Sequence, residues 1–148
     1  MTNADLRDLV VLDTNVLLAA TDRSHESHGE ALALLNHEAR RLALTPQIVR
    51  EYLAVATRPV EANGLGMPGS DAAANMEQFL EDIELLPENI ATSRSVMGLV
   101  DQNIAIGTQV HDANVVAVAL AHGARAIVTG NTRHFVRFAD SITIESLR

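Results

Sequence analysis

An unbroken apolar run, Leu9–Leu12, ends abruptly at the acidic residue Asp13. A run this short, rich in valine and bounded by polar residues, predicts a strand that is buried on both faces, as in a parallel sheet. Ligands of open α/β sheets bind at the carboxyl ends of the strands. The run therefore predicts both a class of sheet and an acidic side chain on its functional edge.

Helical and strand-like patterns alternate along the rest of the chain. Helices are expected over 14–20, 25–40, 46–58, 92–106 and 112–121, with another capped by Ser70 and extending to Ile83; further strands are expected over 42–44, 85–86, 126–128 and 142–144. Such alternation predicts an α/β fold in which helices flank a central, mainly parallel sheet. The length suits one domain, so we expect residues 1–148 to form a single domain.

Composition excludes several kinds of chemistry. There is no cysteine, and all 11 basic residues are arginine, so thiolate metal sites, cysteine nucleophiles and lysine chemistry are excluded. The N-terminus carries acids where a signal peptide carries bases, and the apolar stretch 115–121 is too short to span a membrane. We therefore expect a cytoplasmic protein with no membrane partner. The net charge of −8 argues against a nucleic-acid partner unless acids gather in a metal-binding pocket.

Three acids are candidates for such a pocket. Asp13 follows the first strand, Glu51 shares a helix face with apolar residues, and Asp112 opens a later helix. Each also has an ordinary structural explanation, since aspartates cap helices and Glu51 could be solvated. Together, however, clustered carboxylates need a cation, and oxygen ligands favour Mg²⁺ or Mn²⁺. Such ions can activate water and hold a phosphodiester in line. Asn131, just beyond the strand at 126–128, places an amide on the same edge.

Four segments resemble, in order and spacing, the motifs of PIN-domain nucleases. They are Val10–Leu18, Ile48–Tyr52, His111–Ala117 and Ile127–Phe135. Over essentially the whole chain, the pattern is similar to the toxins of VapBC-type toxin–antitoxin modules. The resemblance implies a PIN-like three-layer fold and a metal-dependent endoribonuclease that hydrolyses RNA.

The resemblance also implies roles for particular residues and partners. Asp13, Glu51 and Asp112 are implied as ligands of Mg²⁺ or Mn²⁺, or of metal-bound water; Thr14, Asn15 and Thr129 are implied as supporting residues. Asn131 stands where many relatives have an acid, so it can offer an oxygen but no negative charge. A homodimer and a small antitoxin protein are implied as partners. An acidic toxin would attract a basic antitoxin segment.

Two alternatives remain open at this stage. One is another Mg²⁺-dependent phosphoryl-transfer enzyme, such as a phosphatase of the haloacid-dehalogenase type, although Asn15 replaces its second aspartate and lysine is absent. The other is a non-catalytic PIN-like binding module, against which the three acids argue. The GxGxxG pattern at 64–69 follows a helix and not a strand, so we interpret it as a connector.

Overall fold

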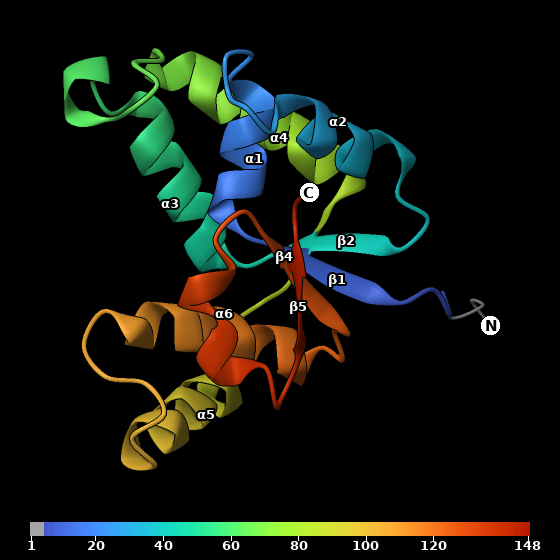
Figure 1. Cartoon of the computed structure of the whole chain (residues 1–148), viewed down its shortest axis with the longest axis vertical. Coiled ribbons are helices and arrows are strands. Elements are labelled where there is room, and N and C mark those ends of the chain that lie inside the picture. The colour runs from blue at the N-terminus through green and yellow to red at the C-terminus, as the bar shows by residue number, and fades with distance from the viewer. Residues whose placement is uncertain (1–4) are drawn as a thin grey trace.

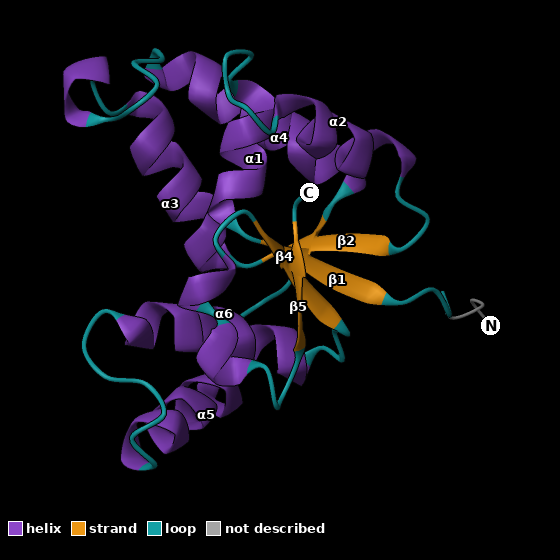
Figure 2. Cartoon of the chain, viewed as in Figure 1, coloured by secondary structure: helices purple, strands orange, loops and turns teal. Residues whose placement is uncertain are grey.

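The computed structural model describes residues 5–148 and is built on a five-stranded sheet (Figures 1 and 2). The strands are β1 (Leu9–Leu12), β2 (Arg41–Leu44), β3 (Glu84–Leu85), β4 (Ala126–Thr129) and β5 (Thr143–Ser146). Their order is β3-β2-β1-β4-β5, and every neighbouring pair is parallel. The predicted α/β class and the parallel sheet are confirmed, with β1 in the centre.

Within residues 5–148, six α-helices surround the sheet. They are α1 (Thr14–Thr21), α2 (His28–His37), α3 (Pro46–Thr57), α4 (Gly69–Asp82), α5 (Ile90–Asp101) and α6 (Gln109–Ala121). In Figure 2, α1, α2 and α4 lie above the strands and α5 and α6 lie below them. Helix α3 runs beside the carboxyl ends of the strands, toward which both α1 and α6 extend (Figure 1). The expected three-layer arrangement is confirmed.

Several element boundaries differ from the sequence-based expectation. The helix expected over 25–40 is shorter, and the one expected over 92–106 begins and ends earlier. Ser70 is not a helix cap, because α4 already begins at Gly69 after Pro68. Asp112 does not open its helix, because α6 begins three residues earlier, at Gln109. Asp112 therefore lies in the first turn of α6, where the helix dipole still favours a negative charge.

The core is built from small and branched side chains because aromatic residues make up only 3% of the chain. All four residues of β1 and all four of β4 are buried, as expected for strands covered on both faces. Helix α6 has five consecutive buried residues, Val115–Ala119, because α5 packs against it on the side away from the sheet. Tyr52, Phe135 and Phe138 are the three largest fully buried side chains.

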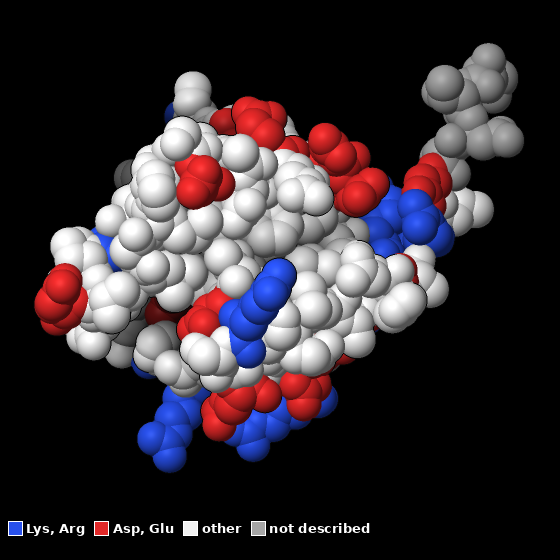
Figure 3. Space-filling model, turned by 90° about the horizontal axis from the view of Figure 1, so that it is seen from above, with Lys and Arg blue, Asp and Glu red and all other residues white. Residues whose placement is uncertain are grey.

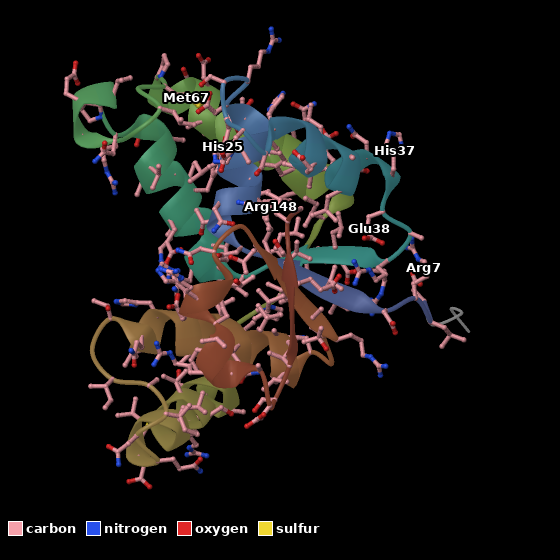
Figure 4. All side chains as sticks on the ribbon, in the orientation of Figure 1. Arg7, His25, His37, Glu38, Met67 and Arg148 are labelled. Carbon is pink, nitrogen blue, oxygen red and sulfur yellow. The ribbon has the colours of Figure 1, made fainter. Side chains whose placement is uncertain are left out.

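Arg40 lies at the end of the sheet away from α3 and α6, and its side chain reaches Glu145, which is level with Leu12 in the sheet. Arg40 donates to Glu38 Oε1 at 2.8 Å and to Glu145 Oε2 at 2.6 Å, and so connects the loop before β2 to the edge strand β5. Figure 4 shows Glu38 at this end of the molecule, together with Arg7. Within residues 5–148, no helix is both long and apolar enough to span a bilayer.

Candidate active site

Asp13 lies directly beyond β1, and its side chain caps helix α1. Its Oδ1 accepts a hydrogen bond of 2.8 Å from the backbone N–H of Thr14. Its Oδ2 accepts bonds from Thr129 Oγ1 at 2.7 Å and from Asn15 Nδ2 at 3.2 Å. The capping explanation for Asp13 is therefore correct. It leaves room for a second role, because a carboxylate has about four acceptor positions and three are filled here.

Thr129 and Asn15 bind each other as well as Asp13. The fully buried Thr129 hydroxyl accepts bonds from Asn15 Nδ2 at 3.3 Å and from the backbone N–H of Asn131 at 2.9 Å. Asn15 Oδ1 accepts a further bond of 2.8 Å from the backbone N–H of Gly130. These bonds join the carboxyl ends of the neighbouring strands β1 and β4. The Asp13 carboxyl group is consequently held in one orientation.

Glu51 is half-buried on α3, and both of its carboxylate oxygens are hydrogen-bonded. Oε2 accepts a bond of 2.8 Å from Thr14 Oγ1, and Oε1 accepts a bond of 2.8 Å from Gln47 Nε2. Thr14 follows Asp13 in the chain, so its hydroxyl and backbone N–H tie the two acids together. Glu51 is thus directed toward Asp13 rather than left as a solvated flank residue.

Asp112 is also half-buried, in the first turn of α6. Unlike the other two acids, its carboxyl group accepts no hydrogen bond from any residue within 5–148. A half-buried carboxylate without donors is costly unless a cation or water satisfies it. Asp112 is therefore the most available of the three acids for binding a ligand.

The pKa values of Asp13 and Asp112 indicate that the negative charges of the three acids act on one another. Burial raises the pKa of Asp13, and the negative charge of Glu51 adds to this effect, while hydrogen bonds from Thr129 and Thr14 oppose it. Burial likewise raises the pKa of Asp112, and the charges of Asp13 and Glu51 raise it further. Mutual repulsion of this kind requires that the three groups lie within electrostatic reach. The structure therefore brings the three sequence-predicted acids to one region.

Two basic side chains approach this acidic region from the segment after β4. The positive charges of His134 and Arg137 oppose the rise in the pKa of Asp112. His134 Nε2 also lies 3.2 Å from Asn131 Nδ2. Among the described residues, the Asn131 side chain makes no hydrogen bond to Asp13, Glu51 or Asp112.

The family of the chain follows from its sequence taken with this geometry. A family model for the PIN domain matches residues 9–133, which include every site residue described above except His134 and Arg137. The chain belongs to the PIN domain family. No protein with a curated description matches the sequence.

Solved structures of similar shape include several toxin–antitoxin proteins. A VapBC complex from Salmonella typhimurium bound to DNA has a TM-score of 0.67 and 20% identity, over 95% of this chain and 99% of that one. VapBC2 from Rickettsia felis, bound to a promoter DNA fragment, has a TM-score of 0.66 and 19% identity, over 93% and 98%. VapC20 from Mycobacterium tuberculosis, described as a sarcin-ricin loop cleaving toxin, has a TM-score of 0.66 and 13% identity, over 90% and 96%. At these identities the similarity establishes the fold.

The carboxylate oxygens of this PIN domain are ligands that suit a hard divalent cation, although the acids do not form a closed metal site. No three His, Cys, Asp or Glu side chains among the described residues are grouped tightly enough to hold a metal ion where they stand. The three acids nevertheless offer only carboxylate oxygens, which Mg²⁺ and Mn²⁺ prefer. No described residue holds the Asp112 carboxyl group by a hydrogen bond, so a cation would displace no donor from it.

Sequence reasoning missed two polar residues of the site. Gln47 is buried and donates to Glu51, and Asn114 Nδ2 donates to Gln47 Oε1 at 2.9 Å. One signal was present in the sequence, because Gln47 precedes Glu51 by four residues and must share its helix face. The partnership with Asn114, 67 residues away, depends on how α3 and α6 pack and has no local signal.

Proposed function

We propose that this PIN domain is a metal-dependent endoribonuclease in which Asp13 and Asp112 hold Mg²⁺ or Mn²⁺, with Glu51 as a further ligand or as the acceptor of a metal-bound water. The observation that carries the proposal is the Asp112 carboxyl group. It is half-buried, lacks a hydrogen-bond donor among the described residues and is repelled by two neighbouring acids. A shared cation would relieve that repulsion and satisfy its oxygens.

The side chains of the site have different roles in the proposed hydrolysis of a phosphodiester. A bound divalent cation would supply charge for the developing phosphorane and lower the pKa of a water molecule. Thr129 and Asn15 fix the orientation of Asp13, and Thr14 and Gln47 fix that of Glu51. Hydrolysis places the hydroxyl of water on phosphorus and the remaining proton on the leaving ribose oxygen. Asp13 and Glu51 are therefore held ready before the substrate arrives, which lowers the reorganisation needed for reaction.

Positive charge close to the acids offers a contact for the RNA backbone. His134 and Arg137 act electrostatically on Asp112, so each can also approach a phosphate bound there. Figure 3 shows one face of the molecule, on which the arginines are separated by acidic and uncharged side chains and form no continuous basic stripe. We infer that RNA binding depends on a few arginines near the site and on the cation, rather than on the charge of the whole protein.

We further propose that the protein is the toxin of a toxin–antitoxin pair, forms a homodimer and is neutralised by a small antitoxin protein. Support comes from the similar structures, several of which are VapBC complexes. The net charge of −8 favours an antitoxin segment that carries arginine or lysine toward the acids. The expected result is loss of RNA cleavage when the product of a neighbouring small gene is added at equimolar concentration.

Removal of the metal is expected to abolish cleavage reversibly. The purified protein is incubated with total bacterial RNA, and new 5′ ends are mapped by sequencing. Discrete new ends should form in Mg²⁺ or Mn²⁺, disappear in excess EDTA and return when Mn²⁺ is added back, because the acids alone cannot offset the charge of the transition state.

Two outcomes would contradict this proposal. Cleavage that persists in EDTA would mean that the acids do not act through a metal. A folded protein that binds its antitoxin but cuts no RNA at saturating Mn²⁺ would instead be a binding module.

A further inference from the structure

A chain of hydrogen bonds runs from the surface to Glu51 through two amide side chains. Asn114 Nδ2 donates to Glu88 Oε1 at 3.0 Å and to Gln47 Oε1 at 2.9 Å. Gln47 Nε2 then donates to Glu51 Oε1 at 2.8 Å and to the backbone carbonyl of His111 at 2.9 Å. The chain links α3 and α6, which carry Glu51 and Asp112, to the loop before α5.

The surroundings of Gln47 determine which way its amide points. Its Nε2 faces two acceptors, the Glu51 carboxylate and the His111 carbonyl, and its Oε1 faces the donor Asn114 Nδ2. Turning the amide over would place its oxygen against both acceptors and leave Asn114 opposite a second donor. Only one orientation satisfies every partner, so the side chain is locked. Gln47 is also buried, which strengthens these bonds and makes each one costly to lose.

The position of Gln47 gives it more than a packing role. One of its Nε2 bonds orients the carboxylate of Glu51 directly. The other binds the backbone carbonyl of His111, the residue before Asp112, and so ties the first turn of α6 to α3. The negative charges of Glu51 and Asp112 repel each other. Gln47 is neutral, and it hydrogen-bonds both the Glu51 carboxylate and the residue before Asp112. A group that orients metal-binding side chains from behind typically raises metal affinity by about 10–100-fold.

We propose that Gln47 is a positioning residue that sets the spacing of Glu51 and Asp112 for a divalent cation, with Asn114 holding Gln47 in place. The inference rests on the proposed function, because it assumes that these acids share a metal. It predicts an effect on metal binding itself, separate from any effect on RNA or on the stability of the fold.

The test is a titration with Mn²⁺ alone, in which electron paramagnetic resonance measures the free ion. Gln47→Met keeps the length and neutrality of the side chain and removes its hydrogen bonds. We expect this change to weaken Mn²⁺ binding by about 10–100-fold. Asn114→Leu frees Gln47 without removing it and should weaken binding by a smaller factor. Arg40→Met is the control, because Arg40 forms ion pairs with Glu38 and Glu145 and with no residue of the site, so Mn²⁺ binding should be unchanged at 0.15 M salt.

Each outcome bears on one of the two proposals. Wild-type affinity in a folded Gln47→Met protein would overturn the positioning role, and so would equal losses in Gln47→Met and Arg40→Met. If Gln47→Met does not fold, wild-type affinity in Asn114→Leu overturns it. A wild-type protein that binds no Mn²⁺ would refute the proposed function first and this inference with it. Weakened binding in both site variants and unchanged binding in the control supports both.

Discussion

Asp13→Asn is expected to reduce RNA cleavage by about 10³-fold or more while the protein stays folded. The change is nearly isosteric, but it removes the negative charge from the best-oriented of the three acids. Metal ions supply several kcal/mol of transition-state stabilisation, and about 4 kcal/mol corresponds to about 10³-fold in rate. Cleavage rates at saturating Mn²⁺ test this expectation. Asp101→Asn, the same change at an exposed acid at the end of α5, should cleave at the wild-type rate.

The stability of Asp13→Asn distinguishes a functional acid from a structural one. Burial raises the pKa of Asp13 in the folded state above its value in the unfolded chain. Its ionised form therefore lowers the free energy of unfolding at neutral pH. This loss disappears as the pH falls from the folded-state pKa to the unfolded-state pKa. The neutral amide avoids this loss but gives up one of the hydrogen bonds that the carboxylate accepts. With these effects opposed, we expect the free energy of unfolding in EDTA to change by less than about 1 kcal/mol. Large destabilisation, or cleavage at the wild-type rate, would contradict the assigned role.

Tyr52→Ala is expected to lower the free energy of unfolding by about 3–5 kcal/mol. Tyr52 is fully buried on α3. Its ring packs edge-on against Phe79 of α4, with 5.6 Å between the ring centroids, and its hydroxyl oxygen lies 2.9 Å from Thr21 Oγ1 of α1. The substitution leaves a cavity where three helices meet. Since native domains have only about 5–15 kcal/mol of stability, the loss is severe. Urea denaturation followed by circular dichroism measures it.

Tyr52→Phe separates the ring from the hydroxyl. It keeps the packing against Phe79 and should cost only about 1 kcal/mol, because Thr21 Oγ1 still donates to the Leu17 carbonyl at 2.8 Å. A loss below about 2 kcal/mol in Tyr52→Ala would mean that α3 is not held to its neighbours by this residue. Tyr52 adjoins Glu51 in the chain, so a displaced α3 should also weaken Mn²⁺ binding.

The sequence was sufficient to predict the features that depend on local patterns. The apolar run before Asp13 predicted a buried parallel strand, and the helix expected from residue 46 does begin at Pro46, directly after its cap Thr45. The helix expected to end at residue 121 does end there, two residues before Gly123, whose positive φ of 74° favours glycine. In each case residues adjacent in the chain decide the conformation, so no knowledge of packing is needed.

Errors arose where two local signals competed. The helix now seen as α5 was expected over 92–106, and apolar residues do continue at helical spacing as far as Ala105. In the structure, α5 instead begins after Asn89, whose side chain forms a capping box with Thr92, and the helix ends at Asp101. Asn103 then adopts a left-handed conformation with a φ of 59°, which a continuing helix cannot contain. Beyond it the chain is a loop in which Ala105 is buried and Ile106 is exposed.

The candidate site could be predicted as a set of residues but not as a network. Motif order identified Asp13, Glu51 and Asp112, because each acid lies in a recognisable short pattern. The distribution of donors among them depends on tertiary contacts: Thr14 reaches Glu51 across 37 residues, and Asn114 reaches Gln47 across 67. That Asp112 alone lacks a described donor could not be anticipated from spacing. This difference is what makes the three acids chemically unequal.

Anomalous X-ray diffraction from crystals soaked in Mn²⁺ tests most directly whether these acids share a cation. The account predicts a strong anomalous peak within about 2.0–2.3 Å of a carboxylate oxygen of both Asp13 and Asp112, the range of oxygen ligands around small divalent ions. The Asp112 side chain should have turned toward Asp13. A peak elsewhere on the molecule, or none between these two residues at saturating Mn²⁺, would contradict the account.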